Sequence, residues 1–164
     1  MDNEIALLIL TIDEAFDRRS WHGTNLRGSI RGVSHVAAAR RPAPGRHNIW
    51  EIVVHAAYWK YTVRRRLLNE KRGSFAVEGS NWIPRPVKNT AAAWKEDIAL
   101  LENEHRALRE VVTGLRGNDL TKALGRRRDV TVGFLLRGIA SHDLYHAGQI
   151  QLLKRLLRPA SHHH

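Results

Sequence analysis

The chain has 164 residues, of which 43% are hydrophobic and only 12 are Gly and 5 are Pro, a composition typical of one ordered globular domain with its own core. It contains no cysteine, which excludes disulfides, thiolate zinc sites and a cysteine nucleophile, so any bound metal must be held by imidazole, carboxylate or water. The net charge of +11 favours anionic partners, either nucleic acid or a small anionic substrate.

The first stretch predicts an amphipathic helix over residues 3–18, because its apolar residues recur at intervals of three and four. These residues are Ile5, Leu8, Ile9, Ile12, Ala15 and Phe16. Asp2 and Glu4 stand where a signal peptide carries positive charge, and the apolar run at 5–10 is too short to cross a bilayer. Together with the absence of cysteine, this favours a cytoplasmic protein without a membrane partner.

Residues 21–47 predict a long connection that contains one short helix. Glycines interrupt the helical periodicity, Ser34 is a candidate N-cap, and the Pro and Gly residues at 42–45 end the short helix near residue 40. His22, His35 and His47 are interpreted as surface histidines rather than as ligands.

The second long helix is predicted over residues 48–68, with Asn48 as its N-cap. Its buried stripe contains Ile52, His55, Trp59 and Thr62, and we expect Trp59 in the core. His55 lies among apolar neighbours and needs an internal partner, which a metal ion shared with other histidines would provide. Glu51 precedes His55 by one turn, which makes it a candidate acceptor behind a ligand or a general base. A plain surface glutamate is the alternative.

Residues 71–90 are too polar and too interrupted by Gly and Pro for a helix, and Phe75 and Trp82 can pin this stretch to the body of the protein. Its roughly 20 residues can span about 60 Å, which exceeds the length of the preceding helix. We therefore expect a crossover, and the helices on either side of it need not be antiparallel neighbours.

The third long helix is predicted over residues 90–115, where Gly114 and Gly117 end it. Its buried stripe consists of Trp94, Ile98, Leu101, His105, Leu108, Val112 and Leu115. His105 has no second histidine beside it, so a hydrogen-bonding role in the core is favoured and a role as a reserve ligand is the alternative.

The fourth long helix follows the turn at 126–129 and carries the strongest chemical signal. Its stripe consists of Leu135, Ile139, His142, His146, Ile150, Leu153 and Leu157. His142 and His146 are four residues apart, so their imidazoles can point to a common ion. The alternative is that each imidazole is satisfied by a carbonyl or hydroxyl group in the core, and a third ligand is needed to decide.

Basic clusters at 64–66, 71–72 and 126–128 fall at helix ends or in loops, where solvated arginine is common. No recognition helix, zinc finger or RNA-binding signature accompanies them, so we do not expect nucleic acid as the main partner. The final residues, His162, His163 and His164, resemble an affinity tag, which leaves residues 1–160 as the expected single domain and 161–164 as a tag remnant.

Four amphipathic helices without alternating strands predict an all-α four-helix bundle, a fold in which inward side chains commonly build metal sites. Three segments, Trp21-His22-Gly23, residues 41–55 and residues 142–150, together resemble the DinB/YfiT-like metalloenzyme family. The resemblance implies a bundle with a long crossover between helices two and three, and a homodimer. It also implies one ligand from the second helix and a pair from the fourth, namely His55, His142 and His146, with water completing the coordination.

Relatives in that family imply a thiol-dependent S-transferase, isomerase or hydrolase that acts on a small molecule, with a low-molecular-weight thiol as cosubstrate. A divalent ion such as zinc or nickel, held by three neutral imidazoles, keeps open positions where it can activate water or a thiol. Trp59 stands one turn after His55, where a carboxylate-rich version of the site would carry an acidic residue. The alternatives are a non-catalytic binding or structural bundle and a basic nucleic-acid-binding protein.

Overall fold

The computed structural model describes residues 2–125 and 128–157, and within these ranges the regular structure is entirely helical. The α-helices are α1 (Asn3–Phe16), α2 (Leu26–Ile30), α3 (His35–Ala39), α4 (Ile49–Leu67), α5 (Ala91–Thr113) and α6 (Val132–Leu156), with a 3-10 turn η1 (Gly117–Asp119). The predicted all-α class is confirmed. In the same ranges, none of the helices combines the length and the apolar character that crossing a membrane requires. The C-terminal histidines interpreted as a tag lie outside the described residues, as do Arg126 and Arg127.

Ser34 and Asn48 cap helices as the sequence predicts, since their side chains accept hydrogen bonds from backbone amides in the first turns of α3 and α4. The side chain of Thr90 caps α5 in the same way. Helix α2 was not predicted, because Gly28 suggested a break. The side chain of Asn25 caps α2 through the Gly28 amide, and a Cβ on Gly28 would lie only 2.9 Å from Asn25 Oδ1. The glycine therefore permits the cap that starts this helix.

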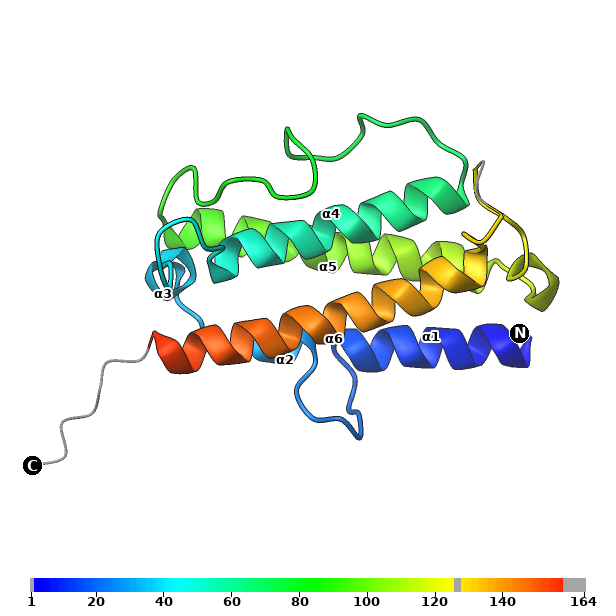
Figure 1. Cartoon of the computed structure of the whole chain (residues 1–164), viewed down its shortest axis with the longest axis horizontal. Coiled ribbons are helices and arrows are strands. Elements are labelled where there is room, and N and C mark those ends of the chain that lie inside the picture. Colours follow the sequence, from blue (N-terminus) through cyan, green and yellow to red (C-terminus); the bar gives the residue numbers. More distant parts are fainter. Residues whose placement is uncertain (1, 126–127, 158–164) are drawn as a thin grey trace, which may run out of the picture.

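The long helices lie lengthwise beside one another, as Figure 1 shows. Helices α1 and α6 run in one direction and α4 and α5 run in the other, with α4 packed on α5 and α6, and α1 packed on α6 and α5. Residues 68–90 contain no helix and run back along α4 before α5 begins. Because this segment returns to the starting end of α4, α4 and α5 are parallel neighbours.

The core matches most of the predicted stripe positions. Leu101 and Leu108 of α5 and Ile139 and Ile150 of α6 are all buried. The placement of Trp59 in the core was right only in part, because this side chain packs against the core but is only partly buried, and its indole N–H donates to Asn81 Oδ1 at 3.0 Å. A polar partner outside the core holds Trp59 at the edge. Trp50, which is also on α4, is fully buried.

Two charged side chains are fully buried where α4 meets α6. Lys60 Nζ of α4 donates to Asp143 Oδ2 of α6 at 2.5 Å, and Nζ also lies 4.8 Å from the ring centre of Phe16. Burial raises the pKa of Asp143 to about 6 while the Lys60 charge opposes that shift, so the carboxyl group stays ionised at pH 7. The ion pair therefore joins two long helices inside an apolar environment.

His105 is buried in the core as predicted, but the predicted hydrogen bond is not seen among the described residues, where its Nδ1 has no partner. Its ring stacks on Phe16 with 3.7 Å between centroids, and its Nε2 lies 3.7 Å from Asp13 Oδ1. Burial, with smaller contributions from the positive charges of Lys60 and Arg109, lowers the pKa of His105 to about 3. The imidazole is therefore neutral at physiological pH.

Burial of His105 predicts a specific loss of stability in acid. Its folded-state pKa of about 3 lies below the ordinary value of 6.5, so the unfolded chain binds more protons at every pH between these values. The free energy of unfolding should therefore fall as pH drops from about 6.5 towards 3, by roughly 2 kcal/mol at pH 5 from this residue alone. In His105→Phe, the loss between pH 7 and pH 5 should be smaller by that amount, as measured by urea unfolding of metal-free protein. Equal losses in wild type and variant would contradict this assignment.

Candidate metal site

Three histidines converge where the middle of α4 faces the middle of α6. His55 comes from α4, and His142 and His146 come from successive turns of α6. The Nε2 atom of His142 lies 3.1 Å from Nε2 of His55 and 3.0 Å from Nε2 of His146. One ligand atom from each of the three residues falls within 4.8 Å of the others. Two nitrogen ligands of a tetrahedral zinc ion stand about 3.3 Å apart, so the two separations from His142 are close to those of a metal site.

Hydrogen bonds behind the imidazoles fix which nitrogens carry protons. His55 Nδ1 lies 3.0 Å from the carbonyl oxygen of Asn81, which can only accept, so Nδ1 is the protonated nitrogen and Nε2 has a lone pair. His146 Nδ1 lies 2.7 Å from Gln149 Oε1, which gives His146 the same tautomer. Two lone pairs therefore point at the same place. A proton on His142 Nε2 can satisfy one of them but not both, whereas a cation can bind all three nitrogens.

Burial keeps all three imidazoles in the neutral form that a metal requires. Desolvation lowers the pKa of His55 to about 4 and that of His142 to about 3, and it also lowers the pKa of His146. Repulsion between the imidazolium forms contributes further to the shifts of His55 and His142. The Nδ1 atom of His142 is buried and has no hydrogen-bond partner among the described residues. At pH 7 the cluster therefore consists of three neutral imidazoles, the form that binds a metal ion.

The crossover between α4 and α5 supplies groups that orient His55. Asn81 provides the carbonyl acceptor, and its backbone has the left-handed φ of +59°, which asparagine tolerates better than most residues. The indole of Trp82 stacks on His55 with 3.7 Å between centroids, and its other face stacks on His47 at the same separation. Asn81 was not predicted from the sequence, because a loop has no periodicity that would indicate which side chains or carbonyls face inward.

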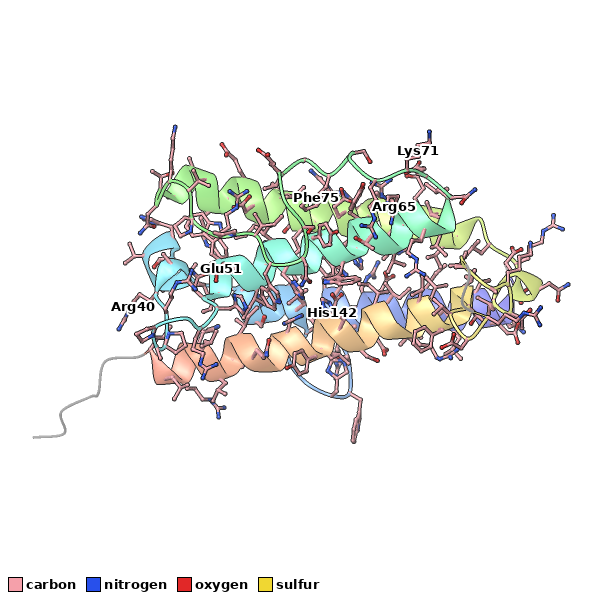
Figure 2. All side chains as sticks on the ribbon, turned by 45° about the horizontal axis from the view of Figure 1, so that its top comes forward. Arg40, Glu51, Arg65, Lys71, Phe75 and His142 are labelled. Carbon is pink, nitrogen blue, oxygen red and sulfur yellow. The ribbon has the colours of Figure 1, made fainter. Side chains whose placement is uncertain are left out.

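Glu51 occupies a different environment from the one predicted. It lies near the start of α4, whereas His142 lies midway along α6 (Figure 2). Its buried carboxylate accepts hydrogen bonds from Arg41, from the backbone amide of Asn48 and from His47, whose Nδ1 lies 3.2 Å away. The surface alternative was therefore wrong.

These contacts favour a structural role for Glu51. Burial opposes its ionisation, but the hydrogen bonds, above all that from Arg41, outweigh burial and lower the pKa of the carboxyl group. A role in proton transfer stays a prediction, since the described hydrogen bonds of this carboxylate do not include His55, His142 or His146. The interpretation of His47 as an ordinary surface histidine was incomplete, because its ring is held between Glu51 and Trp82.

A small apolar cavity gives one of the three histidines access to a ligand. It has a volume of about 120 Å³ and lies between α4 and α6, where His142, Trp59, Phe134 and Ile139 are among its lining residues. A cavity of this size admits a few atoms next to the imidazole cluster, which suits an open coordination position better than a closed structural metal site.

Comparison with known proteins places these residues in a family. The model of the DinB superfamily matches residues 19–150, a range that contains His55, His142 and His146. No curated protein and no solved structure matched the chain. Since the family model covers most of the sequence, the chain belongs to the DinB superfamily.

Proposed function

We propose that this protein is a divalent-metal-dependent enzyme on a DinB-type four-helix bundle, with His55, His142 and His146 as the metal ligands. One observation supports the proposal above all others. The Nδ1 protons of His55 and His146 are committed to Asn81 and Gln149, so two Nε2 lone pairs converge with His142 on one point. A cation satisfies this arrangement, and hydrogen bonds among three neutral imidazoles do not.

Zinc and nickel are the proposed ions, because imidazole suits both. Such an ion, bound by three protein ligands, supplies a Lewis acid that lowers the pKa of a coordinated water or thiol. The chain's own residues hold the imidazoles in position through Asn81 and Gln149, and Trp82 covers one face of His55 and limits the access of water. A small-molecule substrate, a low-molecular-weight thiol as cosubstrate, and S-transfer, isomerisation or hydrolysis as the reaction are proposed on the family resemblance alone.

We also propose a cytoplasmic homodimer, on the same family resemblance. Two tryptophans, Trp21 and Trp82, are candidates for its interface, and Trp21 is fully exposed on the connection between α1 and α2. Trp82 is stacked between His47 and His55, so it belongs to the candidate site. Trp21 is therefore the better candidate for contact with a second copy.

Metal stoichiometry tests the proposal directly. Protein that lacks residues 161–164 should hold about one equivalent of zinc or nickel per chain, whereas His55→Ala, His142→Ala and His146→Ala should each hold close to none, because two imidazoles bind far more weakly than three. His22→Ala and His47→Ala are matched controls and should retain the full equivalent. Elemental analysis after equilibration with the ion and gel filtration provides the measurement, and circular dichroism checks that each variant is folded.

Two outcomes would contradict the proposal. A triple His55, His142 and His146 alanine variant that keeps a full equivalent would place the metal elsewhere. Wild-type protein that takes up neither ion would leave a histidine-bearing helical bundle with a binding or structural role.

A further inference from the structure

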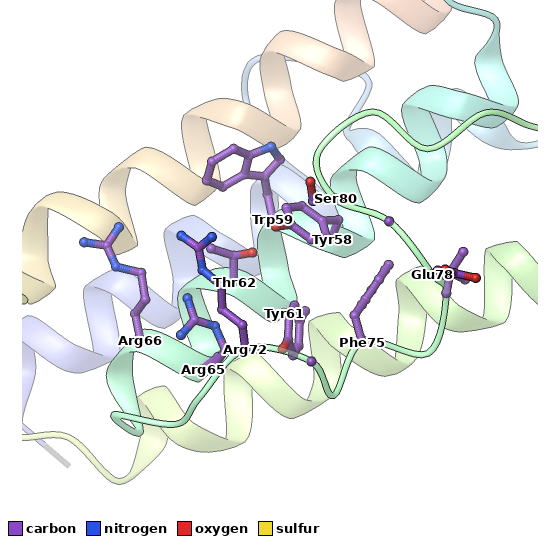
Figure 3. Close-up of a pocket in the computed structure, with 13 residues that line it drawn as sticks. Tyr58, Trp59, Tyr61, Thr62, Arg65, Arg66, Arg72, Phe75, Glu78 and Ser80 are labelled. Atoms are coloured by element: carbon purple, nitrogen blue, oxygen red, sulfur yellow. The ribbon is translucent and has the colours of Figure 1, made fainter.

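A cavity of about 720 Å³ lies between the second half of α4 and the crossover (Figure 3). Its volume is within the range of sites that enclose small organic molecules. One part of its wall is aromatic, since the ring of Phe75 lies 5.3 Å from that of Tyr61 and 5.4 Å from that of Tyr58. Another part is basic and is formed by Arg65, Arg66 and Arg72. The cavity thus offers a wall of aromatic rings next to a group of cations.

In the part of the chain that the structure describes, no ion pair joins Arg65, Arg66 or Arg72 to a carboxylate. Within the described residues, Arg65 Nη1 donates to the carbonyl of Glu70 at 2.8 Å, and its buried Nε has no hydrogen-bond partner. Arg66 Nη2 donates to the carbonyl of Leu124 at 3.5 Å. Arg64, by contrast, pairs with Glu104 and faces elsewhere. A guanidinium group in a concave site attracts an anion, because the surrounding protein screens the charge less than water does.

The acidic residue in the cavity lining does not cancel this charge. Glu78 lies on the opposite side of the cavity from the three arginines in Figure 3, beyond Phe75. The buried hydroxyl of Thr62 also lines the cavity and has no hydrogen-bond partner among the described residues. Both side chains line the cavity, but these two atoms are themselves shielded from solvent, so the charge of the guanidinium groups, rather than an open N–H, provides the attraction for an anion.

Trp59 connects this cavity to the histidine cluster. It lines the large cavity, and its ring centre lies 6.2 Å from that of His142 and 6.3 Å from that of His55. The small apolar cavity that reaches His142 shares Trp59, Thr62 and Arg66 with the large one. A molecule in the large cavity would therefore lie beside the proposed metal site.

We propose that this cavity binds a small organic anion, with its carboxylate on Arg65 and Arg72 and its flat apolar body against Phe75 and the tyrosines. Guanidinium groups match a carboxylate in geometry and charge, and aromatic rings favour a flat partner. The anion is the substrate class of the histidine site, an assignment that rests on the proposed metal-dependent function. Binding of the anion does not depend on metal, so the two proposals can be tested separately.

Binding is measured first by calorimetry on metal-free protein at low salt, with benzoate as the probe and benzamide as its uncharged analogue. Benzoate should bind at least about tenfold more tightly than benzamide, because only benzoate forms charge-assisted hydrogen bonds. Arg65→Gln and Arg72→Gln should each weaken benzoate binding by roughly tenfold and leave benzamide unchanged. Arg72 is exposed in a loop, so Arg72→Gln tests the proposal even if Arg65→Gln perturbs the fold. Arg155→Gln, at an exposed position on α6, is the matched control and should bind benzoate as wild type does.

The relation to the histidine site has its own measurement. In protein loaded with paramagnetic cobalt(II), the ring protons of bound benzoate should relax faster than in zinc-loaded protein. Equal relaxation would overturn the assignment as a substrate site.

Unchanged benzoate affinity in both arginine variants, or equal affinity for benzamide, would overturn anion binding itself. Displacement of benzoate by a short single-stranded oligonucleotide whose binding requires Arg65 and Arg72 would instead assign the cavity to nucleic acid. If the three histidines do not bind metal, the protein will take up no metal and will still bind benzoate, so this outcome is distinguishable from loss of anion binding.

Discussion

Lys60→Met is expected to lower the free energy of unfolding by about 3–5 kcal/mol, since removing one partner of a buried ion pair leaves the other charge uncompensated. The side chains of Lys60 and Asp143 are both fully buried, and Asp143 Oδ1 already lacks a hydrogen-bond partner among the described residues. Lys60 is the cation that offsets the cost of burying Asp143 among the described residues, and the variant removes it. Urea unfolding at pH 7, followed by circular dichroism, measures the loss.

Two comparisons separate this explanation from simple loss of packing. The double variant Lys60→Met with Asp143→Val should recover most of the stability, because an apolar pair of similar volume is often neutral or better. The deficit of Lys60→Met should also shrink as pH falls from 7 to 5. In that variant the folded-state pKa of Asp143 rises further above its unfolded value, so protonation removes the uncompensated charge. A single variant as stable as wild type would show that the pair contributes nothing.

Gln149→Leu is expected to weaken zinc affinity by about 10- to 100-fold, the usual cost of removing a hydrogen-bond partner behind a metal-binding histidine. Gln149 Oε1 accepts from His146 Nδ1 at 2.7 Å, and this contact holds the lone pair of Nε2 towards His142. Leucine has similar size but cannot accept the proton, so His146 would be free to rotate or change tautomer. Competition with a chromophoric chelator at pH 7 gives the affinity.

Gln149→Glu is the matched control for this effect. A carboxylate accepts the same proton and adds a negative charge near the ion, so zinc affinity should equal or exceed that of wild type. If leucine and glutamate at this position give the same affinity as glutamine, the orientation of His146 does not depend on residue 149.

Helical periodicity located the long helices because burial is set by one face of each. The stripe positions of α5, such as Leu101 and Leu108, are buried as predicted, and the same pattern placed His55 and His146 inside. Spacing of four residues on α6 predicted that two imidazoles meet, and the structure brings His55 to them. These features are local or periodic, so a single sequence contains them.

Features that depend on contacts between distant segments could not be predicted from the periodicity of the sequence. Lys60 and Asp143 each have a charge that normally indicates a solvated face, and only their mutual contact makes their burial tolerable. Asn81 lies in a segment without periodicity, and its carbonyl faces His55 because of the path of the crossover. Glu51 stands at helical spacing from His55, yet Arg41 and His47, which lie outside α4, determine its environment.

The pairing of α1 with α6 affects how the chain must be made in the cell. Ile5, Ile9 and Ile12 of α1 belong to the same buried cluster as Leu136 of α6, although α1 is synthesised first among the described helices and α6 last. At about 5–20 residues per second, on the order of 10 s pass between their appearance at the ribosome. During that interval the apolar stripe of α1 lacks part of its cover, so nascent chains halted before α6 should be bound by chaperones that recognise exposed apolar helices.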